Sequence, residues 1–466
     1  MLATEARRAA TTNGAVPAAM AVRTRLLLEG AIVPTLLRLA APNVGVMMIL
    51  ALLSTADAYW IGRLGSDALA GVSLVFPLVM LMQTMSAGGM GGGVASAVAR
   101  ALGAGRRSDA SALVGHAVVI ALVMGALFTI GVLVGGPYAY RAMGGQGGAL
   151  AAAHAYSVVV FAGASAPWVF NTLASVVRGT GNMAVPAWTM VATGVLQLAL
   201  CPVLVLGLGG APRLGIAGAG VASVAAFGLG SASLMTFLAS GRSLVRPALR
   251  GFRLRRALFG DILRVGAPGA LNTVLTNLTI VIVTGLVGPF GTYALAGYGM
   301  GARLEYLMIP LAFGFGSALV TMVGTNVGAG HLARAERIAW VGGALAASVT
   351  GAIGLIGAAA PSLWIGLFTT EAEVLAAGAR YLRIVGPCYA FFGLGLALYF
   401  ASQGAGRLLW PLVAGALRLG LAAGGGWLVT RVLGGGLDAL FAVIALALVT
   451  FGSTVALAIR RGAWRA

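Results

Sequence analysis

Long apolar segments recur from Leu36 almost to the end of the chain, each close to the ~20 residues that a helix needs to cross a bilayer. Backbone polar groups find no water inside a bilayer, so such segments fold as membrane-spanning helices. Only 9% of the residues are charged, against about 25% in soluble proteins. We predict an all-α polytopic membrane protein that has the lipid bilayer as a partner and no soluble domain.

Clusters of Gly, Pro and Arg divide the apolar segments. They predict twelve transmembrane helices, near residues 37–61, 68–98, 111–135, 151–177, 184–208, 216–240, 265–288, 293–327, 337–360, 374–401, 409–433 and 437–459. The 72 glycines fit helices that pack closely in a membrane. The glycine run at 88–93 lacks the Lys and Ser/Thr of a phosphate loop, so close helix packing or local flexibility is the better interpretation there.

An internal repeat relates the two halves of the chain. The sequence LRLAAP at 37–42 returns as LRVGAP at 263–268, and ALAG at 68–71 returns at 294–297, both at an offset of 226. Three further matches have an offset of 225: GAG at 103–105 and 328–330, GTG at 179–181 with GAG at 404–406, and Pro186 with Pro411. Six spans are an even number, so both halves enter the membrane from the same side. We predict two homologous six-helix bundles related by a pseudo-two-fold axis along the membrane normal, which is a transporter architecture.

The repeat also predicts the domain boundaries. They are a cytoplasmic tail at 1–35, an N-terminal half at 36–240, a basic cytoplasmic linker at 241–262, a C-terminal half at 263–460 and a cytoplasmic tail at 461–466. Residues 1–25 have no continuous apolar core, so we expect a flexible tail and no cleaved signal peptide.

The distribution of charge predicts the orientation in the membrane. All thirty basic residues are Arg; twenty-two lie in the tails and alternate connections, and four lie in the other connections, at Arg63, Arg141, Arg213 and Arg431. The positive-inside rule therefore places both termini in the cytoplasm. The formal charge of +19 is spread over many connections and forms no single stripe, which argues against a nucleic-acid partner.

Two acidic residues inside predicted spans are candidates for a functional site, because an ionisable group at membrane depth usually faces a cavity or a partner. Asp57 lies one turn before its span ends, where a solvated carboxylate and a proton or cation acceptor are equally good interpretations. Glu305 lies roughly 15 Å into the eighth span, and Arg418 is at a similar depth in the eleventh, so we expect them to pair. Arg303 cannot share the helix face of Glu305 at i, i+2 spacing. For this group we favour a structural charge pair over a substrate cavity.

Several motifs together resemble the multidrug and toxic compound extrusion (MATE) family. They are DAYWIGRLG at 57–65, ALGAGR at 101–106, VRGTGN at 177–182, LGIAGA at 214–219 and VGTNVGAG at 323–330. Their order and spacing cover the chain from Leu36 to Arg460. The resemblance implies an antiporter of the cell inner membrane, not an enzyme, that exports small amphipathic, often cationic compounds in exchange for H⁺ or Na⁺ by alternating access. We expect a monomer without a cofactor or metal.

The resemblance also implies that Asp57 is the coupling carboxylate, with partners on the fourth, fifth and sixth helices at Asn171, Gln197, Cys201 and Ser223. Cys201 stands where a carboxylate is typical, and Gln197 stands where an Asn is typical. Because Na⁺ prefers oxygen ligands and a neutral thiol is a poor one, we favour H⁺ and leave Na⁺ open. Displaced by 226, Asp57 falls on Val283 and Glu305 falls on Val79, so the repeat does not extend to these charges.

The nearest alternative is a lipid-linked saccharide flippase of the same superfamily. A flippase would favour many Arg or Lys side chains in its cavity, to bind pyrophosphate, and the N-terminal spans offer few of them.

Overall fold

The computed structural model describes residues 18–247 and 253–465, without the side chains of residues 18–22, 47, 48, 50–58, 306 and 310. In this part of the chain every regular element is a helix. The first half holds α2 (Ala18–Glu29), α3 (Ile32–Gly62), α4 (Ser66–Thr84), the π-helical turn η1 (Met85–Met90), α5 (Gly91–Gly103), α6 (Arg107–Ala142), α7 (Gly147–Ala162), α8 (Ser165–Gly179), α9 (Ala184–Leu206), the 3₁₀ turn η2 (Leu208–Gly210) and α10 (Ile216–Ala239).

The second half follows after residues 240–255. It holds α11 (Arg256–Val287), the 3₁₀ turn η3 (Gly288–Phe290), α12 (Thr292–Gly328), α13 (Leu332–Ala359), α14 (Pro361–Ile365), α15 (Ala372–Val385), the 3₁₀ turn η4 (Gly386–Cys388), α16 (Tyr389–Ala405), α17 (Leu409–Gly420), the π-helical turns η5 (Leu421–Gly425) and η6 (Leu428–Val432), and α18 (Leu437–Arg460).

The helices are long enough to build a membrane bundle. Ten helical runs among the described residues are long and apolar enough to cross a bilayer, and α7 with α8, bent by 47° at their junction, makes an eleventh if the two form one span. α3 is 31 residues long, although its described apolar part, Ile32–Val46, is shorter than a span. Each of the twelve predicted spans overlaps one of these helices. The predicted all-helical polytopic fold is confirmed.

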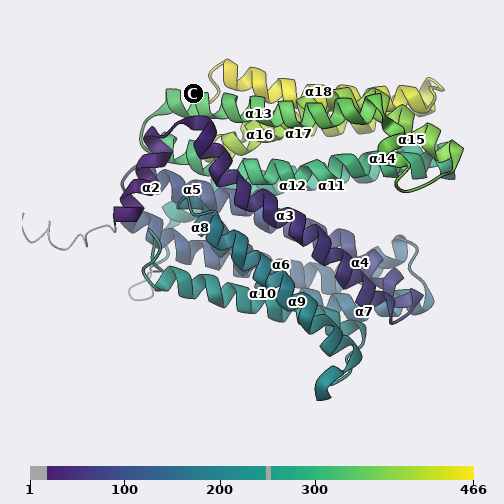
Figure 1. Ribbon diagram of the computed structural model, residues 1–466, viewed down its shortest axis with the longest axis horizontal. Helices are drawn as coiled ribbons and strands as arrows, with labels where there is room; N and C mark the ends of the chain where they lie inside the picture. Colours follow the sequence, from purple (N-terminus) through teal and green to yellow (C-terminus); the bar gives the residue numbers. More distant parts are fainter. Residues whose placement is uncertain (1–17, 248–252, 466) are drawn as a thin grey trace, which may run out of the picture.

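The two halves form separate bundles that meet near the C-terminus and diverge toward the opposite end, where α4 and α7 lie apart from α14 and α15 (Figure 1). We call the end where they meet the closed end; it holds Gly103, Gly179, Gly328 and Gly404, at the ends of α5, α8, α12 and α16. The other end, where α4 and α12 begin, is the open end.

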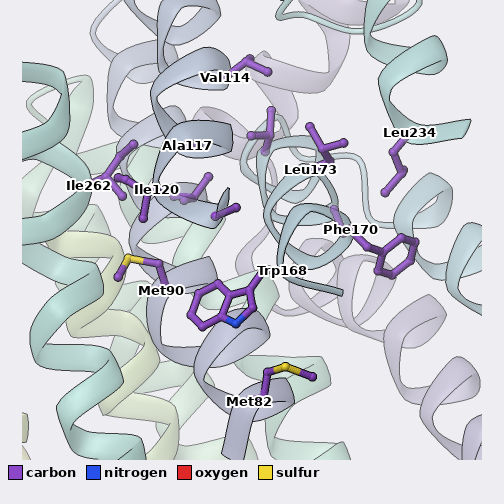
Figure 2. Close-up of a cluster of buried hydrophobic side chains, with 14 of the residues drawn as sticks. Met82, Met90, Val114, Ala117, Ile120, Trp168, Phe170, Leu173, Leu234 and Ile262 are labelled. Atoms are coloured by element: carbon purple, nitrogen blue, oxygen red, sulfur yellow. The ribbon is translucent and has the colours of Figure 1, made fainter. Parts of the chain in front are cut away.

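The apolar cores differ between these two ends. At the closed end they contain residues of both halves: Ile262 of α11 belongs to the core of the first half, beside Met90 and Ile120 (Figure 2), and Leu39 of α3 belongs to a core of the second. At the open end each core belongs to one half, with Ile61 and Val205 in the first and Val287 and Ala294 in the second. Apolar packing therefore joins the halves at the closed end and leaves them independent at the open end.

Contacts at the closed end follow the sequence repeat. Ser96 Oγ donates a hydrogen bond to the carbonyl oxygen of Gln403, and Thr321 Oγ1 donates one to the carbonyl oxygen of Arg178 at 3.0 Å. Donors and acceptors are each related by the offset of 225. The two bonds are therefore the same contact made in both directions across a pseudo-two-fold axis.

Two glycines also make the same contact in both directions across the pseudo-two-fold axis. A Cβ on Gly103 would meet the backbone of Thr325, and a Cβ on Gly328 would meet the backbone of Arg100. Both pairs again follow the offset of 225. We call these hydrogen bonds and glycine contacts the seal.

The π-helical turn η1 accounts for the change of offset from 226 to 225. A π turn of this kind holds one residue more than regular α-helix, and η1 lies between the matches at 68–71 and at 103–105. The equivalent helix α12 is α-helical throughout. The glycines of this region also pack closely, as predicted: a Cβ on Gly89 would lie 2.7 Å from the backbone N of Ala270, and one on Gly93 would lie 2.6 Å from that of Gly266.

Structured segments extend into both predicted tails. α2 lies within the predicted tail at 1–35, of which residues 1–17 are outside the described residues; Leu27 is buried, and Asn326 Nδ2 donates to its carbonyl oxygen at 3.0 Å. In the predicted tail at 461–466, Trp464 is buried and its Nε1 donates to Ser402 Oγ at 3.3 Å. The prediction of flexible residues up to 25 missed α2, because its partner lies almost three hundred residues away in the sequence.

Part of the predicted linker at 241–262 is helical. α11 begins at Arg256, so the last seven residues of that range form the first turns of a helix. Residues 248–252 are outside the described part of the chain.

Candidate functional site

An ion pair joins α12 to α17 inside the second half. Arg418 Nη2 donates to Glu305 Oε1 at 3.2 Å, and the side chains of Arg418 and Glu305 are only 10% and 16% exposed. The Arg418 guanidinium also lies over two aromatic rings, 5.4 Å from the centre of Phe392 and 5.8 Å from that of Phe451. Either charge alone would be costly to bury, so the carboxylate and the rings together stabilise the cation.

A cavity of about 30 Å³ adjoins this pair, which is room for about two water molecules. Its lining comes from the second half and includes Tyr298 and Tyr381, whose rings pack edge to face at 5.3 Å. A pocket for an organic ligand usually measures about 300–1,000 Å³. The space beside Glu305 can therefore hold water, and it is too small for an organic compound.

Arg303, which the sequence prediction grouped with this pair, lies elsewhere. Its side chain is exposed, and its guanidinium lies 5.2 Å from the centre of the Phe368 ring. It is not part of the cavity lining. Arg303 and Glu305 thus project from different sides of α12, as their spacing predicts.

In the first half, a buried polar cluster forms around Asn171 of α8. Asn171 Nδ2 donates to Gln83 Oε1 of α4 at 2.9 Å and to Ser86 Oγ of η1 at 2.8 Å. On the same face of α8, Ser175 Oγ accepts a hydrogen bond from Arg178 Nη2 at 2.8 Å. Polar side chains therefore lead from the interior of the first half down to the seal.

Arg178 is the buried cation of this cluster. It is only 6% exposed, and its guanidinium lies 5.6 Å from the centre of the Phe313 ring of α12, in the other half. Sequence reasoning did not identify Gln83, Ser86 and Arg178 as one cluster. The i, i+4, i+7 spacing of Asn171, Ser175 and Arg178 was the available signal, because these positions share one helix face.

Cys201 lies at a different depth from Asn171. It is 2% exposed and belongs to the apolar cluster that includes Ile61 and Ala68, near the open end. Asn171 bonds to Gln83, which is fifteen residues beyond Ala68 on α4, or about 22 Å along the helix. The structure does not bring these two predicted positions together.

The other predicted coupling residues lie on three helices. Gln197 of α9 and Ser223 of α10 are half-buried. Position 57 is helical and belongs to α3, but the Asp57 side chain is outside the described residues. Ile61, one turn further along α3, belongs to the same cluster as Cys201. Among the described residues, no group of three or more His, Cys, Asp and Glu side chains could hold a metal ion.

Comparison with known proteins gives concordant results. The family model MatE matches residues 42–203 and 268–428, once in each half. The probable multidrug resistance protein NorM of Deinococcus radiodurans is 31% identical over 394 residues, 80% of this chain and 81% of that protein. The probable multidrug resistance protein YoeA of Bacillus subtilis is 28% identical over 365 residues, covering 76% and 77%. An FAD transporter of Shewanella oneidensis is 27% identical over 379 residues, covering 81% and 82%.

Solved structures show the same fold. A MOP superfamily transporter from Pyrococcus furiosus has a TM-score of 0.86 and 24% identity, covering 95% of this chain and 98% of that one. A crystal structure of MATE in complex with MaD3S has a TM-score of 0.84 and 25% identity, covering 94% and 97%.

Proposed function

From the premise that this chain belongs to the MatE family of membrane transporters, we propose that it exports small amphipathic, often cationic compounds in exchange for H⁺. The observation that carries the proposal is the contrast between the two ends of the bundle. The halves share cores and a reciprocal seal at the closed end, and have separate cores at the open end. Alternating access requires two bundles that rock about a central site, with one end closing as the other opens. The names of the NorM and YoeA relatives support the class of cargo.

We propose that the closed end faces the cytoplasm. The turns at this end carry Arg106, Arg107 and Arg407, whereas Arg63 and Arg213 lie at the open end. Arginine-rich connections are retained on the cytoplasmic side. In this orientation, the described arrangement gives the central site access from outside the cell.

Our proposal assigns ion coupling to Asp57 in the first half. Cys201, which would be a partner of Asp57 in a Na⁺ site, is buried among apolar side chains. Na⁺ must exchange its water for several oxygen ligands, whereas a proton needs only one carboxylate. The neutral thiol of Cys201 is a poor ligand for Na⁺, which supports H⁺ as the coupling ion.

For Glu305 and Arg418 we propose a structural role within the second half. The cavity beside them is too small for an organic cation, and the Arg418 guanidinium is covered by two rings. The pair would then keep α12 and α17 together as the half moves as one body.

Everted membrane vesicles test the function and its coupling. Vesicles with the wild-type protein, Asp57→Asn or Asp438→Asn receive ethidium as the lipophilic cation, under an imposed pH gradient or an imposed Na⁺ gradient. Asp438 is an exposed carboxylate at the start of α18, so it serves as the matched control. We expect uptake driven by the pH gradient in the wild type and in Asp438→Asn, and none in Asp57→Asn.

Three outcomes would change the proposal. Ethidium uptake driven by a Na⁺ gradient without a pH gradient would overturn H⁺ coupling. FAD, the cargo named for the Shewanella relative, is tested in the same vesicles; transport of FAD without transport of ethidium would overturn the class of cargo. Transport of neither compound by the wild type would direct the next test to the flippase alternative.

A further inference from the structure

A second, larger cavity lies at the closed end of the second half. Its volume is about 390 Å³, and its walls are the third and fourth turns of α11, the turn between α16 and α17 with the first turn of α17, and the end of α18 with the residues that follow. All of its lining residues belong to the second half. It also shares no lining residue with the small cavity beside Glu305.

Two arginines give this cavity its charge. Arg264 of α11 and Arg407 of the turn before α17 both line it, and both side chains are exposed. Among the described residues neither has a carboxylate oxygen within 4.0 Å, which is the distance that defines the five ion pairs of the structure. The cavity therefore holds two arginines that have no ion-pair partner among the described residues.

The rest of the lining is apolar and aromatic. Pro268, Leu412 and Ile459 line the wall. Trp464 is buried, with its Nε1 bonded to Ser402, while Trp410 is 47% exposed. Tryptophan side chains favour the boundary between hydrocarbon and headgroups, because the ring is apolar and the N–H is polar. The cavity thus combines positive charge with an apolar wall at the depth where helices leave the membrane.

Comparison of the two halves shows that the fold does not require these arginine and tryptophan residues in the cavity lining. Arg264 corresponds to Arg38 at the offset of 226, but Arg407 corresponds to Asn182 and Trp410 to Val185 at the offset of 225. In the first half Asn182 Oδ1 accepts a hydrogen bond from the backbone N of Val185 at 3.2 Å, closing the turn before α9. An arginine has no acceptor with which to close the equivalent turn. The second half has therefore exchanged a local hydrogen bond for a second cation.

We propose that this cavity binds the phosphate headgroup of an anionic membrane phospholipid. The phosphate lies between Arg264 and Arg407, and the glycerol and first acyl carbons lie along Pro268, Leu412 and Ile459. Basic pockets between helices near the membrane surface bind anionic headgroups in this way. A free phosphate ion would make no use of the apolar wall, which favours a lipid as its source. The proposal is independent of the cargo and of the coupling ion.

Native mass spectrometry of the full, delipidated chain in detergent tests this proposal. The protein is titrated with phosphatidylglycerol, phosphatidylcholine or inorganic phosphate. The pocket variant is Arg264→Gln/Arg407→Gln. The control variant, Arg107→Gln/Arg337→Gln, removes the same charge from exposed arginines outside the cavity. We expect phosphatidylglycerol to bind the pocket variant about 25-fold more weakly than the wild type, or about fivefold for each arginine. Binding to the control variant should change by less than about twofold.

A third variant separates binding from folding. Arg407→Asn restores the residue of the first half, and it can close the turn before α17 as Asn182 does before α9. We expect about fivefold weaker phosphatidylglycerol binding with no fall in melting temperature. Equal binding of phosphatidylglycerol to the pocket and control variants would overturn the proposal. So would phosphatidylcholine binding as tightly as phosphatidylglycerol, or inorganic phosphate binding as tightly as the lipid.

Discussion

At the closed end, Ser96 of the first half and Thr321 of the second donate the same hydrogen bond, each to a carbonyl oxygen of the opposite half. Deeper in the bundle, Glu305 and Arg418 of the second half correspond to Val79 and Thr193 of the first. Seal positions pack against both halves at once, so a change on one side must fit the other. Glu305 and Arg418 contact each other and rings of their own half, which leaves the chemistry of this pair free to differ between the halves.

The largest effect on stability should come from removing one member of the Glu305–Arg418 pair, for which the first half has no equivalent. Arg418→Gln leaves the carboxylate of Glu305 buried without its partner, which we expect to cost about 3–5 kcal/mol. The matched change in the first half, Thr193→Val, removes no charge and no hydrogen bond, because Thr193 Oγ1 is buried without a hydrogen-bond partner, so it should not lower the stability. Thermal unfolding of the purified proteins in detergent would measure both. A double variant, Glu305→Gln/Arg418→Gln, should recover much of the loss, and a double variant as unstable as the single would argue against the pair.

Alanine at the seal glycines should have the next largest effect. Gly103→Ala and Gly328→Ala place a Cβ against the backbone of the opposite half, so we expect each to disfavour the closed seal by about 1–3 kcal/mol. Each half should still fold, because Ala favours helix over Gly. Spin labels across the closed end would report the distance between the halves. Gly131→Ala, where a Cβ meets open space, is the control.

The reciprocity of the seal gives a sharper criterion for these two glycines. If the pseudo-two-fold axis governs the packing, Gly103→Ala and Gly328→Ala should open the closed end to the same extent. If the spin-label distance changed in one variant and not in the other, the two glycine contacts would not be equivalent.

The paired hydrogen bonds predict a smaller and slightly unequal effect. Thr321→Val removes one bond to the carbonyl of Arg178, worth about 1 kcal/mol. Ser96→Ala removes the equivalent bond and also an acceptor for Arg100 Nη1, so its effect on the closed seal should be larger. The same spin-label distances would rank the two variants. A larger effect of Thr321→Val would contradict the ranking.

The smallest effect on stability should come from removing an exposed ion pair at the surface of the second half. Arg465 of the second half donates from Nε and Nη2 to the two carboxylate oxygens of Glu336, at 2.9 and 2.7 Å. The Arg465 side chain is 67% exposed, so water and salt screen the pair. We expect Arg465→Gln to leave the melting temperature unchanged. A clear fall would mean that asymmetry at the surface matters as much as asymmetry in the interior.

The repeat could be recognised from the sequence because its glycines adopt a backbone conformation that other residues adopt only with strain. Gly105, Gly181, Gly330 and Gly406 have φ of 73°, 80°, 80° and 76°, a left-handed conformation that glycine adopts without strain. These turns end helices at the closed end of both halves. The pairing of Glu305 with Arg418 followed in the same way from two charges at one depth.

Other features depend on contacts that the sequence does not encode locally. The bonds from Asn171 to Gln83 and Ser86 require the rotation of α8 against α4. The polar face of α8 is visible in the spacing of Asn171, Ser175 and Arg178, but the sequence does not show which residues of another helix that face meets. The burial of Trp464 depends on Ser402, sixty-two residues away. The role of Asp57 stays a prediction.

The π-helical turn η1 lets the first half change length without losing alignment with the second. Inserting one residue into a regular α-helix rotates everything after it by about 100°, which would turn Ser96 and Gly103 away from their partners. In η1 the added residue is absorbed within one turn, so both still face the opposite half. Deleting one residue from 85–90 should therefore be tolerated better than deleting one residue within α5. A register fault that would disrupt most helices is, at this one place, confined to a single turn.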